Sequence, residues 1–185
     1  MRFTLFYRGP LKANRGPKDK QQLRRHFHSQ LKSLWEQPPL SDFRAWLQPE
    51  VRKGEISLIE SIGAFQFAPL VSERIHMLAE LDLTMLRPGP PGELVGHGGD
   101  IDNRIKTLLD ALRVPREPTA LPADDRPSEN ETPFFCLLGD DRLITHLSID
   151  TDTLLDRPGD PAEVVLTLRV TTRLSRLLFD TVGLG

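Results

Sequence analysis

The sequence predicts an α+β fold in which one mixed β-sheet is covered by two main helices. Two stretches have apolar residues at steps of three and four, as an amphipathic helix requires. A third stretch alternates strictly between apolar and polar residues, as a half-buried strand does. Shorter apolar runs bounded by turn residues supply the remaining strands. The chain has 185 residues, the length of one domain, and we expect a single core over residues 1–185.

The N-terminal segment, about residues 1–53, is predicted to be a basic strand–helix unit. A short strand is expected over residues 3–7, and Gly9-Pro10 closes it. The pattern from Pro17 to Gln37 is helical, and two prolines then end it. A second, shorter helical stretch is predicted from about residue 41 to residue 47. The apolar stripe of the main helix consists of Leu23, Phe27, Leu31, Leu34 and Trp35.

The rest of the chain alternates between strands and one further helix. Every odd position from Ile75 to Met85 is apolar, which predicts a strand over residues 74–86 with one face in the core. A helix is predicted to open at Asp100–Asn103 and to run to about Arg113. Residues 114–133 contain five prolines and five acids, so we expect an exposed or partly disordered insertion. Three strands follow, near residues 134–138, 143–150 and 163–171, and the first two resemble a hairpin.

The charge of the chain is unevenly distributed. The formal net charge is −2, but residues 1–53 hold 12 Lys and Arg against 4 acids, a balance of +8. Residues 54–185 hold 12 against 22, a balance of −10. This split favours a polyanionic partner, although charges spread over solvated faces give the same totals. The predicted DNA-binding residues lie in the first loop and on one side of the first helix: Lys12, Arg15, Lys20, Arg24, Arg25, His28 and Lys32.

Cysteine content and hydropathy indicate the compartment. The single cysteine, Cys136, lies in an apolar run and is predicted to pack in a core. It has no second cysteine with which to form an internal disulfide. The apolar opening of the chain is too short for a membrane span or a signal peptide. We therefore expect a cytoplasmic protein with no membrane partner.

The acidic residues at the start of the second helix suggest metal chemistry. Asp100 and Asp102 are separated by one residue, so both carboxylates point the same way if the chain is extended there. Lys106 follows one helical turn after Asp102. Two close carboxylates repel each other unless a cation lies between them, and Mg²⁺ prefers such oxygen ligands. A bound Mg²⁺ activates water for phosphodiester hydrolysis, and we expect a third acid from the Asp140-Asp141 turn.

The run DIDNRIKTLLDAL over residues 100–112, followed by LGDDRLI over residues 138–144, resembles the RusA-type Holliday junction resolvases. These are small homodimeric endonucleases that cut four-way DNA junctions with magnesium. The resemblance extends over about residues 72–150, and it implies a RusA-like fold, a homodimer and branched DNA as substrate. It also implies Mg²⁺ as cofactor, and the sequence leaves the choice between Mg²⁺ and Mn²⁺ open. The catalytic residues that it implies are Asp100, Asp102, Lys106 and Asp141, with the three acids as metal ligands.

Each of these residues also has an ordinary structural interpretation. An Asp before an apolar-periodic run is a common helix cap. Lys106 has the spacing of an i,i+4 ion pair with acids one turn away, and Asp140-Asp141 has the composition of a turn. Two other functions therefore stay open. One is a non-catalytic nucleic-acid-binding protein of the same fold, and the other is a metal-dependent phosphohydrolase that acts on nucleotides.

Overall fold

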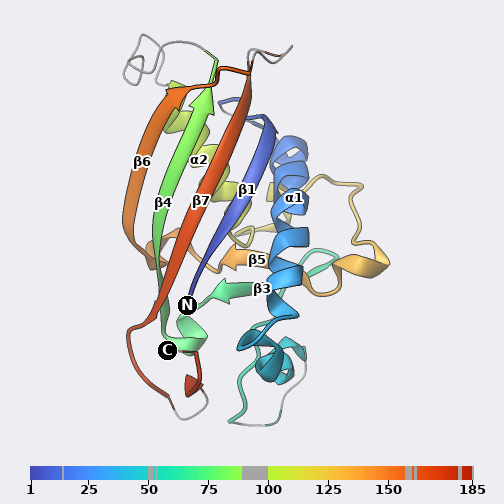
Figure 1. Cartoon of the computed structure of the whole chain (residues 1–185). Coiled ribbons are helices and arrows are strands. Elements are labelled where there is room, and N and C mark those ends of the chain that lie inside the picture. The colour runs from blue at the N-terminus through green and yellow to red at the C-terminus, as the bar shows by residue number, and fades with distance from the viewer. Residues whose placement is uncertain are drawn as a thin grey trace.

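In the computed structural model, the described residues are 1–13, 15–49, 52, 54–88, 100–156, 160, 162–178 and 181–184, and they form two mixed β-sheets packed with helices (Figure 1). The predicted α+β class is confirmed. The larger sheet has the strand order β1 (Arg2–Pro10), β7 (Glu163–Leu174), β4 (Met77–Arg87) and β6 (Ile144–Thr153). The smaller sheet has the order β2 (Glu60–Ile62), β3 (Phe65–Val71) and β5 (Phe134–Leu138).

The larger sheet is antiparallel except at one edge. β1 and β4 both pair antiparallel with β7, whereas β4 and β6 run parallel. A parallel pair requires a crossover, and here the chain leaves β4, passes through the helix α2 (Asp100–Leu112) and β5, and returns as β6. The helix α1 (Pro17–Trp35) lies beside β1 and also contacts α2 and β5 (Figure 1).

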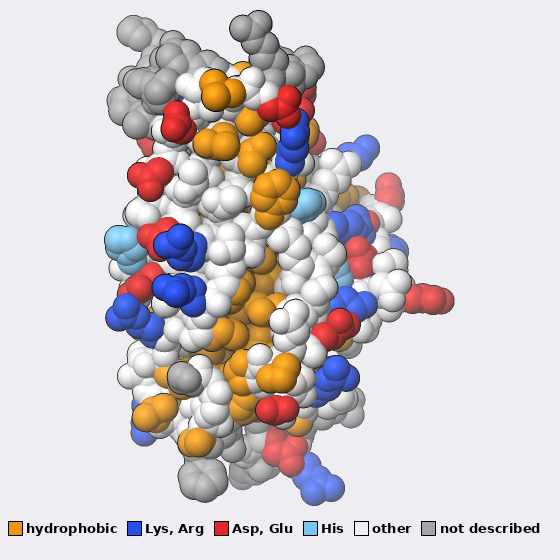
Figure 2. Space-filling model, viewed as in Figure 1, with side chains coloured by type: hydrophobic (Ala, Val, Ile, Leu, Met, Phe, Trp, Pro, Cys, Tyr) orange, Lys and Arg blue, Asp and Glu red, His pale blue; other side chains and the backbone are white. Residues whose placement is uncertain are grey.

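The alternation of apolar residues decides which face of the larger sheet is buried. The odd positions of β4 are buried and its even positions are not. β7 contributes four inward side chains to the same core, Val164, Leu166, Leu168 and Val170. On the opposite face of this sheet, the basic and acidic side chains of the described residues are interspersed and form no single block of positive charge (Figure 2). A continuous polyanion is therefore not expected to bind across this face.

The prediction of one five-stranded sheet with a 134–138/143–150 hairpin is wrong. All five predicted strands exist, but β5 belongs to the smaller sheet and runs parallel to β3. A short 3₁₀ helix, Asp141–Leu143, lies between β5 and β6 and carries the chain from one sheet to the other. The strand predicted over 74–86 begins at Met77, because Glu73–Ile75 forms another 3₁₀ turn.

The insertion over residues 114–133 is exposed over much of its length, as expected, and a few buried side chains hold it against the rest of the chain. It contains two 3₁₀ turns, Pro118–Ala120 and Glu129–Glu131. Val114 and Leu121 are buried in an apolar cluster with β3 and β5. Cys136 belongs to the same cluster, as predicted, and burial raises the pKa of its thiol to about 12. No helix in the described part of the chain combines the length and the apolarity that a membrane span requires.

Candidate nucleic-acid-binding site

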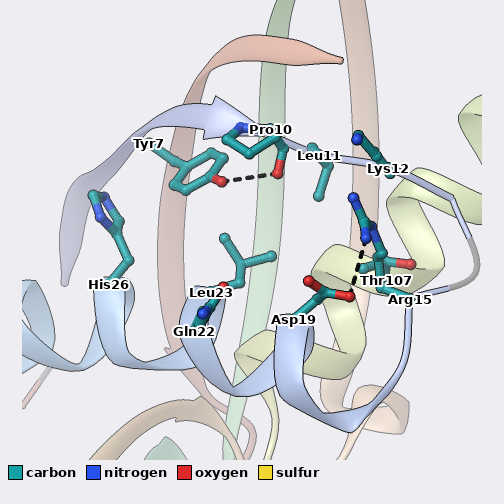
Figure 3. Close-up of a pocket in the computed structure, with 10 residues that line it drawn as sticks. All are labelled: Tyr7, Pro10, Leu11, Lys12, Arg15, Asp19, Gln22, Leu23, His26 and Thr107. Carbon is teal, nitrogen blue, oxygen red and sulfur yellow. Dashed lines mark hydrogen bonds and ion pairs between the residues drawn. The ribbon is translucent and has the colours of Figure 1, made fainter. Parts of the chain in front are cut away.

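A cavity of about 250 Å³ lies between the end of β1, the loop after it and the first half of α1 (Figure 3). The loop is anchored at Leu11, which is buried and whose N–H donates to the carbonyl oxygen of Ala162 (3.0 Å). Tyr7 closes the end of β1, because its hydroxyl donates to the carbonyl oxygen of Pro10 (3.0 Å). Burial raises the pKa of Tyr7, and the positive charge of Arg15 opposes this effect.

Two of the predicted DNA-binding residues lie on the rim of this cavity. Lys12 is exposed and has no ion-pair partner among the residues that the structure describes. Arg15 is half-buried and pairs with Asp19 in the first turn of α1 (Nη1–Oδ2 3.1 Å). This pair holds the loop against the helix and neutralises one of the two cations. The rim therefore keeps a positive charge beside the N-terminal end of α1, where an anion is favoured.

The other polar lining residues come from the two helices. Gln22 and His26 line the cavity from α1, and Thr107 does so from α2. A hydrogen bond between His26 Nε2 and the carbonyl oxygen of Phe6 (2.9 Å) holds the His26 side chain. Its ring packs edge-on against the ring of Tyr7, with 5.0 Å between the ring centroids. The sequence-based prediction missed all three polar residues. The four-residue spacing of Gln22 and His26, which places both on one helix face, is the signal that was present.

The predicted carboxylate pair lies at the start of α2, but its predicted geometry is wrong. The helix begins at Asp100, and two residues separated by one in a helix are rotated by about 200° around its axis. The side chain of Asp100 lies outside the described part of the structure. Asp102 and Lys106 are both exposed, one turn apart on the same side of the helix. Thr107 of this helix lines the cavity, about 8 Å along the axis from Asp102.

Asp141, the predicted third metal ligand, lies near the opposite end of α2. Its carboxylate pairs with Arg116 (3.3 Å) and lies 3.9 Å from Arg113. Arg113 follows Asp102 by eleven residues, which is about 16 Å along a helix. The three predicted acids therefore do not fit a single metal site within one chain. Among the described side chains, no group of three His, Cys, Asp or Glu residues is arranged to hold a metal ion.

Two further acids of the motif have structural roles. Asp110 pairs with Lys20 (2.6 Å) and with Arg113 (2.8 Å), which joins the start of α1 to the end of α2. Burial acts to raise the pKa of Asp110, but hydrogen bonds from these two cations lower it overall. Asp140 caps the 3₁₀ turn that follows it by accepting a hydrogen bond from the Arg142 N–H (2.9 Å), and this bond lowers its pKa to about 2.

The basic side of α1 is turned inward over part of its length, so the predicted exposed ridge is wrong for two of its members. Arg24 and His28 are only 2% and 6% exposed. The Arg24 guanidinium donates to Gln21 Oε1 and to the carbonyl oxygen of Asp110 (3.0 Å). His28 Nδ1 accepts a hydrogen bond from the Phe135 N–H (2.8 Å). These two side chains are occupied inside the protein and are not accessible to DNA.

The neighbouring basic residues of α1 bind the acidic insertion. Arg25 pairs with Glu131 (2.7 Å) and with Asp125 (2.8 Å). Lys32 donates to the carbonyl oxygen of Asn130 (3.2 Å). Part of the charge asymmetry of the chain is therefore satisfied internally. Of the seven predicted DNA-binding residues, Lys12 and Arg15 are the two that line the cavity.

The burial of His28 predicts a pH-dependent stability. Burial lowers the pKa of His28 below its usual value, because it removes the charged ring from water. The unfolded chain therefore binds more protons than the folded chain just below the usual histidine pKa, about 6.5. The contribution of neutral His28 to the free energy of unfolding is fully present above the pKa of the unfolded chain. It decreases as the pH falls from there toward the lower pKa of His28 in the folded chain. We expect the urea midpoint to decrease between pH 7.5 and pH 5.

A glutamine substitution isolates this effect. His28→Gln keeps an acceptor and a donor but cannot titrate, so it should reduce the decrease in the urea midpoint between the two pH values. The control is His146→Gln, which removes an exposed histidine of β6, and the decrease in the urea midpoint should remain in this variant. A His28→Gln protein with the same pH profile as the wild type would show that His28 does not control this transition.

Comparison of the chain with protein-family models, with curated proteins and with solved structures finds no match. Function is therefore inferred from the residues of the chain and from their geometry.

Proposed function

We propose that the protein is a structure-selective DNA endonuclease of the RusA type that hydrolyses phosphodiesters at branched DNA. One observation carries the proposal: α2 takes part in both halves of the site. Its first turns hold Asp102 and Lys106 on the surface, and Thr107 lines the cavity that Lys12 and Arg15 border. The cavity with the basic rim, proposed to bind phosphate, therefore lies beside the helix whose first turns carry the acid proposed to act on it.

In this proposal the residues have separate roles. Lys12 and Arg15 hold phosphates of the DNA backbone. Asp102 would hold Mg²⁺ or Mn²⁺ as a carboxylate ligand, and the bound ion would supply an activated water and neutralise phosphoryl oxygens. Lys106, one turn after Asp102, neutralises charge on the phosphate or on the leaving oxygen. Asp141 is left out of the site, because its partners are Arg113 and Arg116. The proposal includes a homodimer that acts in the cytoplasm.

A second function is favoured by one observation. Asp102 and Asp141 lie near opposite ends of α2, and no three carboxylates among the described side chains of the chain are arranged around an ion. A protein that binds branched nucleic acid without cutting it needs only the basic rim. This non-catalytic alternative shares every DNA contact with the proposed endonuclease, and only an activity measurement separates the two.

The test is an incubation of the purified protein with end-labelled four-way junction, linear duplex of the same sequence, and nucleoside triphosphates. Each substrate is tested with Mg²⁺, with Mn²⁺ and with a chelator. We expect cleavage of the junction alone, and only with metal present. Binding of the junction without cleavage under any condition would favour the non-catalytic protein. Hydrolysis of triphosphates with an intact junction would favour a nucleotide phosphohydrolase.

A further inference from the structure

The cavity beside β1 has two chemically different parts. Its floor is apolar and consists of buried side chains, mainly Leu11 and Leu23, together with the ring of Tyr7 (Figure 3). Its rim carries the cations Lys12 and Arg15 and the carboxylate of Asp19, which pairs with Arg15 (3.1 Å), so the rim keeps one net positive charge. A site for inorganic phosphate alone does not need an apolar floor, and a site for an apolar ligand does not need two cations. The lining therefore matches a ligand that has an anionic end and an apolar, planar end.

We infer that this cavity binds one unpaired nucleotide, with the base on the apolar floor and the 5′-phosphate at Lys12 and Arg15. The inference rests on the proposed function, because it names the feature of branched DNA that the site recognises. Gln22 and His26 also line the cavity and offer hydrogen-bonding groups to the edge of a base. The Nε2 atom of His26 is engaged by Phe6, so Nδ1 is the ring atom left for the base.

The state of the base follows from the shape of the site. The cavity is a recess of about 250 Å³ between a strand end and a helix, not an open groove along a sheet. A base that is stacked and paired in a duplex exposes only its edges, so its flat face cannot reach an apolar floor. A base that has left the stack can do so, and apolar or aromatic contact with its face is independent of sequence. Unpaired nucleotides, including those at a junction, are therefore the ligand class.

The test is a calorimetric titration of the full chain with deoxynucleoside 5′-monophosphates, with no divalent metal and no DNA. Inorganic phosphate and the matching nucleosides are the comparison ligands. We expect each monophosphate to bind at least about tenfold more tightly than inorganic phosphate, the scale that contact with one base contributes. Nucleosides should bind more weakly than monophosphates, because they lack the group that Lys12 and Arg15 hold.

Substitutions locate the binding site. Lys12→Ala and Arg15→Gln should each weaken monophosphate binding by about fivefold or more, since each removes a cation from the rim. Lys18→Ala is the matched control, because Lys18 is an exposed lysine of the same segment that does not line the cavity. Equal affinity for phosphate and for monophosphates would overturn the inference. An equal loss of affinity in Lys18→Ala would also overturn it, because binding would then depend on charge alone.

The outcome is separable from that of the proposed function. A protein that binds monophosphates at the cavity and cuts no junction would overturn the endonuclease and keep the nucleotide site. A protein that cuts junctions and binds monophosphates no better than phosphate would keep the endonuclease and overturn the nucleotide site.

Discussion

Replacing Asp102 with asparagine should reduce cleavage of a four-way junction by about 100-fold or more and leave DNA binding unchanged. The substitution preserves the shape of the side chain and removes the negative charge that a hard divalent ion requires. Asp102 is exposed, and Asn is tolerated near a helix start about as well as Asp, so the fold should not change. Single-turnover kinetics test the loss of cleavage, and an equilibrium titration of the same preparation tests whether DNA binding is unchanged.

Two comparison variants make this result specific. Asp124→Asn removes an exposed acid from the insertion and should cut at the wild-type rate. Lys106→Ala should lose cleavage as Asp102→Asn does but keep the thermal stabilisation by Mg²⁺ or Mn²⁺, because its expected partner is a phosphate oxygen. Wild-type cleavage by Asp102→Asn would remove this acid from the chemistry. A clear loss of stability in Asp102→Asn would instead indicate a structural acid.

Truncating Arg24 should cause the largest loss of stability among the basic residues of α1. The side chain is buried, and its guanidinium donates to Gln21 and to the carbonyl oxygen of Asp110. Arg24→Ala leaves a cavity and two acceptors without this donor, so the free energy of unfolding should decrease by about 2–4 kcal/mol. Urea unfolding measures this decrease, and Lys18→Ala should show no change.

A methionine at the same position separates packing from hydrogen bonding. Arg24 Nε and Gln21 Nε2 are buried and have no hydrogen-bond partner within the described structure, so burial of this cation is incompletely compensated. Burial also lowers the pKa of Arg24, because removing the charged guanidinium from water disfavours its protonated form. Arg24→Met should therefore lose less stability than Arg24→Ala. If Arg24→Ala is fully stable and binds DNA more weakly, this face of α1 contacts DNA and the internal role of Arg24 is wrong.

The elements whose pattern reflects one buried face were predictable from sequence. β4 has one apolar face and one polar face, so its alternation located it to within three residues at its start. α1 was found from its apolar stripe in the same way. β3 has five consecutive buried residues and contains Pro69, so it has neither alternation nor a typical strand composition. β5 belongs to the second sheet because it pairs with β3, a strand distant in sequence. The local sequence of β5 does not predict this pairing.

The candidate site was predicted less completely for a different physical reason. Four-residue spacing correctly placed Arg24 and His28 on one helix face, but it does not reveal what covers that face. Here the covering groups are α2 over Arg24, and the insertion and β5 over His28, all of them more than 80 residues away in sequence. The motif at the start of α2 was visible because its residues are contiguous. The cavity beside it was not, because it combines β1, α1 and α2.

In the proposed complex, DNA contacts the loop of Lys12 and Arg15 together with the first turns of α2. The most direct measurement is photocrosslinking of a four-way junction to the wild-type chain in the presence of a chelator, with crosslinked peptides identified by mass spectrometry. We predict crosslinks in residues 10–22 and 100–107, and none around Arg25, Lys32 or Asp141. Crosslinks confined to the insertion and the second half of α1 would contradict this claim.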